Sequence, residues 1–252
     1  MTVFHLKLIA LTSMIIDHMG AIIPEVFGLP PEGINLFRVI GRVAFPIFVY
    51  LIAEGFRHTK SPEKYLVRLG IFALISEIPF DLAFRGGLSW TSFFENTNIF
   101  YTLFLGGAAI FVYNLMLEHG KKRFKTRFQN VCVHVVAVFP TLVFMLFADI
   151  LTADYGAYGV AFIFIMYVIK PVKFRLAAMA TLCIWQHHVL IEFIIRGYGL
   201  RIPITYFLMI PATLVPVFFI AYYNGQRGPS FKWWFYAAYP VHLVIVAIVT
   251  IL

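Results

Sequence analysis

An aspartate and a histidine, Asp17 and His18, stand side by side within an apolar run that extends from residue 6 to residue 27. An ionisable side chain at the centre of a membrane costs roughly 2.5–3.5 kcal/mol on insertion scales, so such residues usually serve a function. A carboxylate beside an imidazole also supplies the groups of a general base. Adjacent residues point to different faces of a helix, so one partner cannot cover both side chains. This pair is therefore the first candidate for chemistry.

Other ionisable residues lie inside apolar runs at helical spacing. Arg38 and Arg42 are four residues apart, as are Glu77 and Asp81, so each pair shares one face of a helix. The remaining members of this set are Glu54, His187, His188, Glu192 and His242. Among them we rank His242 as the second candidate base, after His18, and the His188–Glu192 pair as the third.

Each of these residues also has a structural interpretation. Arg38 can extend its guanidinium to the membrane surface. Intramembrane arginines and carboxylates often pair to hold helices together, and this alternative applies to Glu77 and Asp81. Histidines in apolar runs can be hydrogen-bonded packing residues, which is the favoured interpretation of His134. The sequence leaves these alternatives open.

Known metal and phosphate motifs are missing from the chain. It contains no His-x-x-His, His-Glu-x-x-His or Cys-x-x-Cys spacing, no glycine-rich phosphate loop and no Gly-x-Ser-x-Gly elbow. Cys132 and Cys183 both lie in apolar runs and do not indicate a disulfide framework. We therefore expect no metal cofactor, and a serine-hydrolase activity has no support.

The composition is that of a membrane protein. Hydrophobic residues make up 61% of the chain and charged residues only 13%, whereas soluble domains carry about 25% charged residues. The mean hydropathy is +0.86. The net charge of +8 comes from Lys and Arg gathered in short loops, without a basic stripe among aromatic residues. We therefore expect the protein to have the lipid bilayer, and not a nucleic acid, as its partner.

Apolar runs of about 20 residues, separated by charged residues or by Pro and Gly, predict membrane-spanning helices. We predict an all-α, polytopic bundle of about nine such helices. They cover residues 6–27, 34–55, 66–84, 98–117, 131–151, 156–170, 176–195, 204–223 and 234–252. The sixth is short, so it is either a half-helix or part of its neighbour. Because no loop is long enough for a soluble domain, we expect residues 1–252 to form a single transmembrane domain, and no cleavage site follows the first run.

The basic residues predict the orientation of the bundle. If the N-terminus is cytoplasmic, most Lys and Arg residues fall in loops on that side, and the opposite loops carry few of them. This pattern indicates an N-in, C-out topology. With a helix rise of 1.5 Å per residue, His18 and His242 then lie near the middle of the membrane and the two arginines, Arg38 and Arg42, in its outer half. We expect several ionisable groups to meet in one interior cavity.

Longer stretches surround these residues and extend over the whole chain. They are residues 6–20 (LKLIALTSMIIDHMG), 38–48 (RVIGRVAFPIF), 76–81 (SEIPFD), 223–228 (YNGQRG) and 239–243 (YPVHL). Together they resemble the TraX family, the F-pilin acetylases. The resemblance implies an integral protein of the bacterial cytoplasmic membrane that transfers an acetyl group from acetyl-CoA to an amine or hydroxyl. The acceptor it implies is a pilin-like peptide, a saccharide or a lipid.

The resemblance also implies roles for individual residues. TraX proteins are similar to a wider group of transmembrane acyltransferases in which a histidine of an early helix is catalytic, so His18 becomes the leading general base. The carboxylate that orients its imidazole would be Asp17, Glu77 or Asp81. Arg38 and Arg42 would stabilise the oxyanion or bind an anionic acceptor, because a guanidinium keeps its charge when buried. Docking of the acyl-CoA phosphates would fall to four residues near the cytoplasmic mouth: Arg57, Lys60, Lys64 and Arg68.

Two other classes of function compete with this prediction. Buried Asp, Glu, His and Arg also form the proton relays and substrate sites of transporters, although no internal repeat of the kind common in transporters is evident. A non-catalytic assembly protein is the third possibility, but it does not explain why polar residues lie inside the spans. The basic loops at the cytoplasmic mouth are explained equally well by topology alone.

Overall fold

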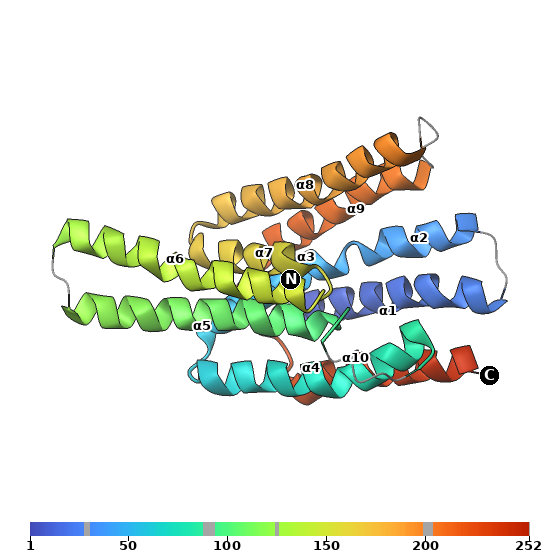
Figure 1. Ribbon diagram of the computed structural model, residues 1–252, viewed down its shortest axis with the longest axis horizontal. Coiled ribbons are helices and arrows are strands. Elements are labelled where there is room, and N and C mark those ends of the chain that lie inside the picture. Colours follow the sequence, from blue (N-terminus) through green and yellow to red (C-terminus); the bar gives the residue numbers. More distant parts are fainter. Residues whose placement is uncertain (28–30, 88–93, 124–125, 199–203, 252) are drawn as a thin grey trace. The chain divides into compact units, whose positions relative to one another are not determined.

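The computed structural model describes residues 1–27, 31–87, 94–123, 126–198 and 204–251. Within these ranges the chain forms ten α-helices and no strand (Figure 1). In chain order they are α1 (Val3–Phe27), α2 (Pro31–Gly41), α3 (Ala44–His58), α4 (Pro62–Arg85), α5 (Ile99–Arg123), α6 (Arg127–Ile150), α7 (Gly156–Val168), α8 (Val172–Tyr198), α9 (Ile204–Ala221) and α10 (Lys232–Ile251). The predicted all-α bundle is confirmed.

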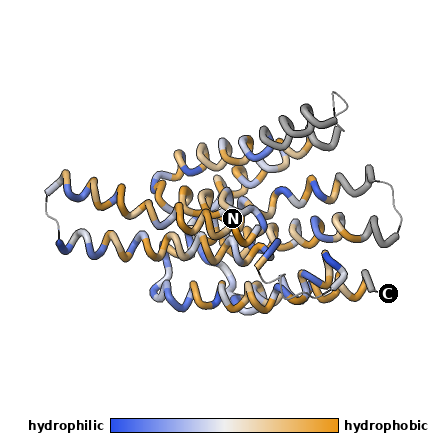
Figure 2. Tube along the Cα trace, in the orientation of Figure 1, coloured by the Kyte–Doolittle hydropathy of each residue, from blue (hydrophilic) through white to orange (hydrophobic). Residues whose placement is uncertain are grey.

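Five helical segments of the described chain are long and apolar enough to cross a membrane: Val3–Ile22, Leu36–His58, Ile99–Gly120, Phe128–Ile150 and Lys232–Val249. Shorter apolar helices cover Gly156–Val168 and Leu208–Ala221. Large apolar side chains on α6 are exposed, for example Phe139 at 63% and Leu146 at 60%. Hydrophilic residues gather at the end of α5 and the start of α6 (Figure 2). The protein is thus a helical-bundle membrane protein whose apolar surface suits lipid.

The second predicted span, residues 34–55, corresponds to the candidate span Leu36–His58, and its helix is interrupted within that span. The α2 helix ends at Gly41 and α3 begins at Ala44. Pro46 has no N–H for the carbonyl of Arg42, and its ring would clash with that carbonyl in a continuous helix. In the first turn of a new helix proline is tolerated, so the break falls just before it. The Arg42 and Val43 N–H groups instead donate to Val39 and Ile40, at 3.2 and 3.3 Å.

The chain divides into two compact units, which are described separately. Unit 1 comprises Met1–Leu51, Leu82–Gly86 and Ile169–Leu252, and unit 2 comprises Ile52–Asp81 and Gly87–Val168. Two helices, α3 and α4, continue from one unit into the other. That both units act as one transmembrane domain stays a prediction.

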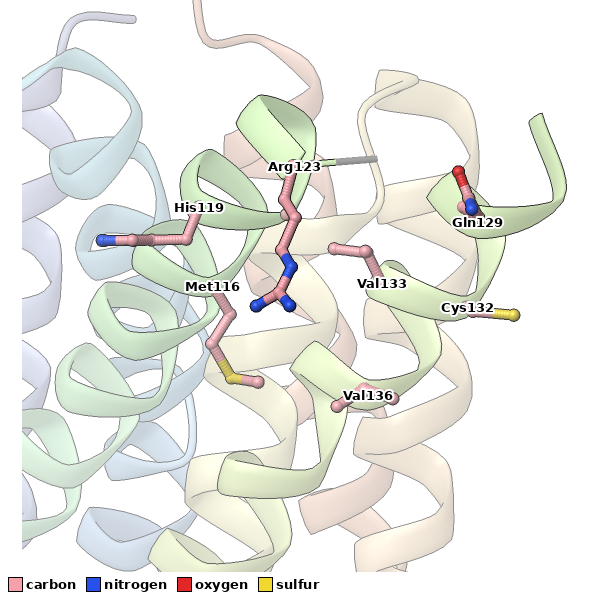
Figure 3. Close-up of a pocket in the computed structure, with 8 residues that line it drawn as sticks. Met116, His119, Arg123, Gln129, Cys132, Val133 and Val136 are labelled. Atoms are coloured by element: carbon pink, nitrogen blue, oxygen red, sulfur yellow. The ribbon is translucent and has the colours of Figure 1, made fainter. Parts of the chain in front are cut away.

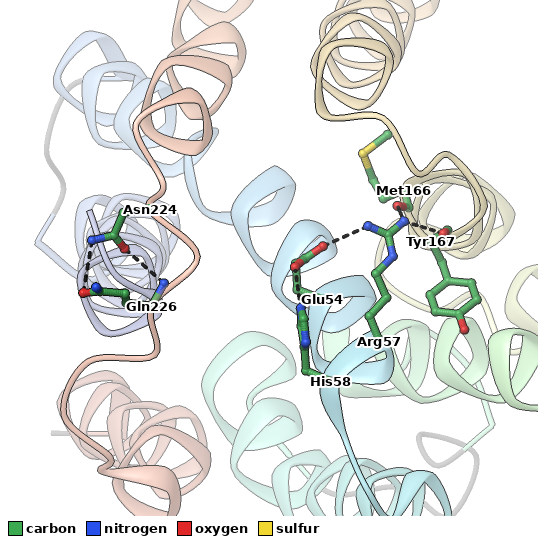
Figure 4. A network of polar contacts seen from close by, with 7 residues as sticks. All are labelled: Glu54, Arg57, His58, Met166, Tyr167, Asn224 and Gln226. Carbon is green, nitrogen blue, oxygen red and sulfur yellow. Dashed lines mark hydrogen bonds and ion pairs between the residues drawn. The ribbon is translucent and has the colours of Figure 1, made fainter.

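In unit 1, α1 packs against α2 and α10, α8 packs against α9, and α9 also contacts α2. The start of α1 is held by the loop before α10: the N–H groups of Val3 and Phe4 donate to the carbonyls of Gln226 and Arg227 at 2.9 and 3.1 Å. These bonds satisfy donors that a helix start leaves without intrahelical partners. The loop itself is fixed because the Gln226 N–H donates to Asn224 Oδ1 at 3.1 Å (Figure 4).

In unit 2, α5 and α6 form an antiparallel hairpin along their lengths, and both pack against α7 (Figure 1). Glycines permit this close approach. A Cβ atom on Gly106 would lie 2.6 Å from Ile163 Cδ1, and one on Gly120 would lie 2.4 Å from Val133 Cγ1. Small residues at helix contacts are the usual means of bringing membrane helices together.

Candidate functional site

The imidazole of His18, on α1, contacts the imidazole of His242, on α10. His18 Nδ1 and His242 Nε2 are 2.7 Å apart. The other ring nitrogen of His242, Nδ1, lies 3.0 Å from the carbonyl oxygen of Ala238, one turn earlier in α10. The structure therefore joins two histidines that are 224 residues apart in the chain, the first- and second-ranked candidate bases of the sequence.

Aromatic side chains enclose this histidine pair. The rings of Phe84 and Tyr239 meet the His18 ring edge to face, with centroids 5.2 and 6.1 Å away. Tyr239 also meets the ring of His242 at 5.3 Å. His242 is buried, at 6% exposure, whereas His18 is half-buried. Aromatic rings thus flank the pair, and His18 is its more exposed member.

The neighbour of His18 in sequence, Asp17, serves a different partner. Its carboxylate binds two guanidinium groups of α2 and the α2–α3 break: Arg38 Nη1 lies 2.5 Å from Oδ2, and Arg42 Nη2 lies 3.6 Å from Oδ1. The Asp17, Arg38 and Arg42 side chains are 17%, 34% and 18% exposed. We call these three residues the Asp17 cluster. The described contacts of Asp17 are with arginines, and the described partner of the His18 imidazole is His242, so the expected Asp17–imidazole pairing is not the arrangement seen.

A glycine makes the Asp17 cluster possible. A Cβ atom on Gly41 would lie 2.0 Å from Asp17 Oδ1, closer than any side chain allows. The carboxylate therefore rests against the bare backbone of α2, between the two arginines. Gly41 was not among the predicted site residues, although a glycine between two arginines inside an apolar helix, where it costs about 1 kcal/mol relative to alanine, was a usable signal.

Two more histidines of the predicted set belong to α8 in unit 1. His187 is buried, at 3% exposure, and its Nε2 has no hydrogen-bond partner within the described part of the chain. The side chains of His188 and Glu192 lie outside the described residues, so the third candidate base stays a prediction.

The two carboxylates of α4, Glu77 and Asp81, are completely buried in unit 2, at 0% exposure. Glu77 Oε2 accepts hydrogen bonds from the backbone N–H and side-chain Nδ2 of Asn98, at 3.1 and 2.6 Å. Asn98 in turn accepts the N–H of Phe100 at its Oδ1, at 2.9 Å, and donates to the carbonyl of Ala73, at 2.8 Å. Glu77 and Asn98 thus fix the start of α5 against α4. The predicted role of Glu77 or Asp81 in orienting His18 stays a prediction.

The four residues predicted to dock acyl-CoA have different surroundings. Arg57 donates to Glu54 Oε1 at 2.9 Å, to the carbonyl of Met166 at 2.8 Å and to the carbonyl of Tyr167 (Figure 4). It therefore caps the C-terminal end of α7, where a cation is favoured. The guanidinium of Arg68 lies 5.7 Å from the ring centre of Tyr65. Lys60 and Lys64, by contrast, are exposed.

A pocket of about 450 Å³ opens between the end of α5 and the start of α6 in unit 2 (Figure 3). Its walls are mostly apolar, and Arg123 and His119 are among its polar residues. None of the residues that line it belongs to the predicted site. Among the described residues, no group of three or more His, Cys, Asp or Glu side chains is placed to hold a metal ion.

Comparison with known proteins agrees with the resemblance in the sequence. A model of the TraX protein family matches residues 4–250. The chain belongs to the TraX family. The match covers almost all of both units, and it includes His18, His242 and the whole Asp17 cluster.

Individual relatives of this TraX family member are distant. It is 26% identical to a protein of Dichelobacter nodosus described as "Probable fimbrial assembly protein FimC, serogroup H1", over 96% of this chain and 93% of that protein. It is 24% identical to an uncharacterized protein of Rickettsia prowazekii (strain Madrid E), over 71% of this chain and 60% of that protein. No solved structure matches the chain significantly.

Proposed function

We propose that this protein is a membrane acetyltransferase that uses acetyl-CoA as donor and His18 as general base. The observation that carries the proposal is the arrangement on α1, where consecutive residues supply a hydrogen-bonded imidazole and a carboxylate bound to two arginines. Acyl transfer needs a base beside fixed positive charge. Membership of the TraX family, whose founding members acetylate pilin, supports the same chemistry.

The reaction divides between these groups as follows. The acceptor N–H or O–H gives its proton to His18 while its heteroatom attacks the thioester carbonyl carbon. Negative charge develops on the carbonyl oxygen, and the guanidinium of Arg42 or Arg38 stabilises it. The carbon–sulfur bond then breaks, and the proton held by His18 passes to the departing CoA thiolate. Acetylated acceptor and free CoA are the products, and the histidine returns to its starting state.

The Asp17 carboxylate keeps the two arginines in position for this role. Two guanidinium groups that share one carboxylate leave a net positive charge of one in the Asp17 cluster. Removing charges from water is costly, and pairing reduces that cost. The partial exposure of all three side chains leaves room for a substrate oxygen to approach the arginines.

The donor would reach the site from the cytoplasm, where acetyl-CoA is made. In the proposed N-in, C-out topology of the bacterial inner membrane, the exposed amines of Lys60 and Lys64 attract the CoA phosphates. Arg57 would contribute little, because its guanidinium already binds Glu54 and two carbonyls of α7.

For the acceptor we propose a pilin-like peptide that lies in or at the membrane. The proposal is supported by the Dichelobacter nodosus relative, which is described as a probable fimbrial assembly protein. A saccharide or a lipid acceptor is a possible outcome of the test below, because an attacking hydroxyl needs the same base and the same oxyanion stabilisation as an amine.

The test uses purified protein in nanodiscs with acetyl-CoA that carries a radioactive acetyl group. Release of free thiol and movement of label into a cell-envelope extract are followed together. We expect label in a peptide fraction and a loss of about 10²–10⁴-fold in rate for His18→Ala. His134→Ala is the matched control, because His134 is an intramembrane histidine of unit 2 that binds Tyr113.

The outcomes separate the competing functions. Unchanged turnover in folded His18→Ala contradicts the assignment of the base. Label in lipid or saccharide redefines the acceptor and leaves the reaction intact. If no thiol is released under any condition, the acetyltransferase proposal fails, and transport becomes the function to test.

A further inference from the structure

We infer that His242 is a positioning residue that fixes the tautomer of His18, so that the basic lone pair of His18 lies on Nε2. The inference rests on the contact between His18 Nδ1 and His242 Nε2 and on the contact between His242 Nδ1 and the Ala238 carbonyl. Its consequence for catalysis depends on the proposed function, whereas the tautomer itself does not.

One ring nitrogen of His242 contacts the backbone of its own helix, α10. A carbonyl oxygen can only accept a hydrogen bond, so His242 Nδ1, 3.0 Å from the Ala238 oxygen, must carry the hydrogen. A neutral imidazole carries hydrogen on one nitrogen only. In neutral His242 the other nitrogen, Nε2, is therefore an acceptor.

The tautomer of His242 in turn determines which nitrogen of His18 carries the hydrogen. His242 Nε2 accepts, so the nitrogen 2.7 Å away, His18 Nδ1, must donate. The hydrogen of neutral His18 is then on Nδ1, and the lone pair is on Nε2. A backbone carbonyl of α10 thus determines, through two rings, which nitrogen of a residue on α1 can take up a proton.

The ring geometry supports a hydrogen bond between the two imidazoles. Their planes differ by 26° and their centroids are 4.9 Å apart. With the two nitrogens only 2.7 Å apart, most of the centroid separation lies along the line that joins them. The rings therefore lie nearly end to end, and an N–H bond in the plane of His18 points at the lone pair of His242.

The same arrangement also allows a proton to move between the two imidazole rings during the reaction. When His18 Nε2 takes the acceptor proton, the ring becomes positively charged, and its Nδ1 proton can move to His242 Nε2. The charge then resides on His242, which keeps its Nδ1–H bond to Ala238, while His18 becomes neutral with its hydrogen on Nε2. The reverse shift allows His18 to return that proton to the CoA thiolate, so no proton is gained or lost over the cycle.

The neighbouring carboxylate is not needed for this role. In many catalytic pairs an aspartate holds the histidine tautomer, but here Asp17 is bound to Arg38 and Arg42. A neutral imidazole does the same work without placing a further negative charge in an apolar setting, which would be costly.

The tautomer can be measured directly, without any enzymatic assay. The protein is labelled with ¹⁵N-histidine and reconstituted in nanodiscs, and the His18 signals are assigned by comparison with His18→Gln. We expect hydrogen on His18 Nδ1 and a lone pair on Nε2. A hydrogen found on Nε2 in the neutral protein overturns the inference.

Two variants test whether His242 is the cause. His242→Leu removes the acceptor, and we expect His18 to lose its single tautomer and show both. His242→Gln offers an amide oxygen at a similar reach, and we expect it to restore hydrogen on Nδ1. If His18 keeps the same tautomer in the leucine variant, another group holds it and the inference is wrong. His134→Leu, which alters a different histidine, serves as the control and leaves the His18 signals unchanged.

Kinetics then show whether the position matters for acetyl transfer. We expect His242→Leu to lower kcat by roughly 10²-fold, with a KM for acetyl-CoA that changes little, because His242 acts through His18 and not on the donor. His242→Gln should recover most of that loss. Equal turnover in the leucine variant and the wild type overturns the positioning role. If no form of the protein transfers acetyl groups, the proposed function fails while the tautomer measurement still decides the inference.

Discussion

Asp17 in unit 1 and Glu77 in unit 2 are both carboxylates inside apolar runs of the sequence, and their surroundings differ. The Asp17 cluster in unit 1 binds charge to charge, and its side chains are between 17% and 34% exposed. Glu77 in unit 2 is 0% exposed, and the hydrogen bonds described for its Oε2 come from the neutral amide groups of Asn98. The Asp17 cluster is thus partly exposed, whereas Glu77 is fully buried and holds the start of a helix.

Under the proposed function, this difference in surroundings corresponds to a difference in role. A carboxylate that accepts from the N–H groups at a helix start satisfies donors that would otherwise have no partner. In the proposed reaction, the carboxylate of Asp17 instead keeps two arginines as a positive site beside the base His18, and the partial exposure of the three side chains gives a substrate access to them. Under this proposal, burial and the type of partner, and not the presence of charge, separate the two roles.

The largest expected contrast comes from the same chemical change made at each of the two carboxylates, Asp17 and Glu77. Asp17→Asn removes the charge that holds Arg38 and Arg42, and we expect acetyl transfer to fall by about 10²–10³-fold. Glu77→Gln retains an oxygen that can accept from Asn98, so it should leave turnover per folded molecule within a few-fold of wild type. Both rates are measured by thiol release from acetyl-CoA in nanodiscs. Equal losses in the two variants would show that the two carboxylates do not differ in function.

Removing the Glu77 carboxylate altogether tests whether this residue stabilises the fold. In Glu77→Ala the backbone N–H and side-chain amide of Asn98 lose their acceptor, and each buried group left without a partner costs about 1–3 kcal/mol. We therefore expect a lower melting temperature in detergent. It is measured by size-exclusion chromatography of samples heated to increasing temperatures. At temperatures where the variant stays folded, its kcat should match wild type. A variant that is stable but inactive would instead place Glu77 in the chemistry.

The sequence predicted the fold better than the site, for physical reasons. Apolar runs specify membrane helices through hydrophobicity alone, so the all-α bundle and most helix positions followed directly. The break after Gly41 was missed, although Pro46 marks it, because the run from residue 34 to residue 55 reads as one span in hydropathy.

The partners within the site could not be read from the sequence. His18 and His242 were both ranked as candidate bases, but their contact depends on the packing of α1 against α10. Asp17 was one of three carboxylates, with Glu77 and Asp81, that were expected to orient the imidazole. Neighbouring residues on a helix point to different faces, and this same principle explains why Asp17 contacts α2 while His18 contacts α10.

The smallest expected effect concerns the exposed lysines at the proposed donor entrance. Replacing Lys60 and Lys64 together by alanine should raise the KM for acetyl-CoA about two- to tenfold at low ionic strength and leave kcat unchanged, because these amines attract the CoA phosphates without touching the reacting atoms. The effect should fade as salt is added, since the screening length is about 8 Å at 0.15 M ionic strength.

Arg57→Ala is the informative contrast: its guanidinium caps α7, so its loss should lower stability more than donor affinity. A double-lysine variant with an unchanged KM at every salt concentration would leave these residues with a topological role only, as the asymmetry of basic loops alone predicts.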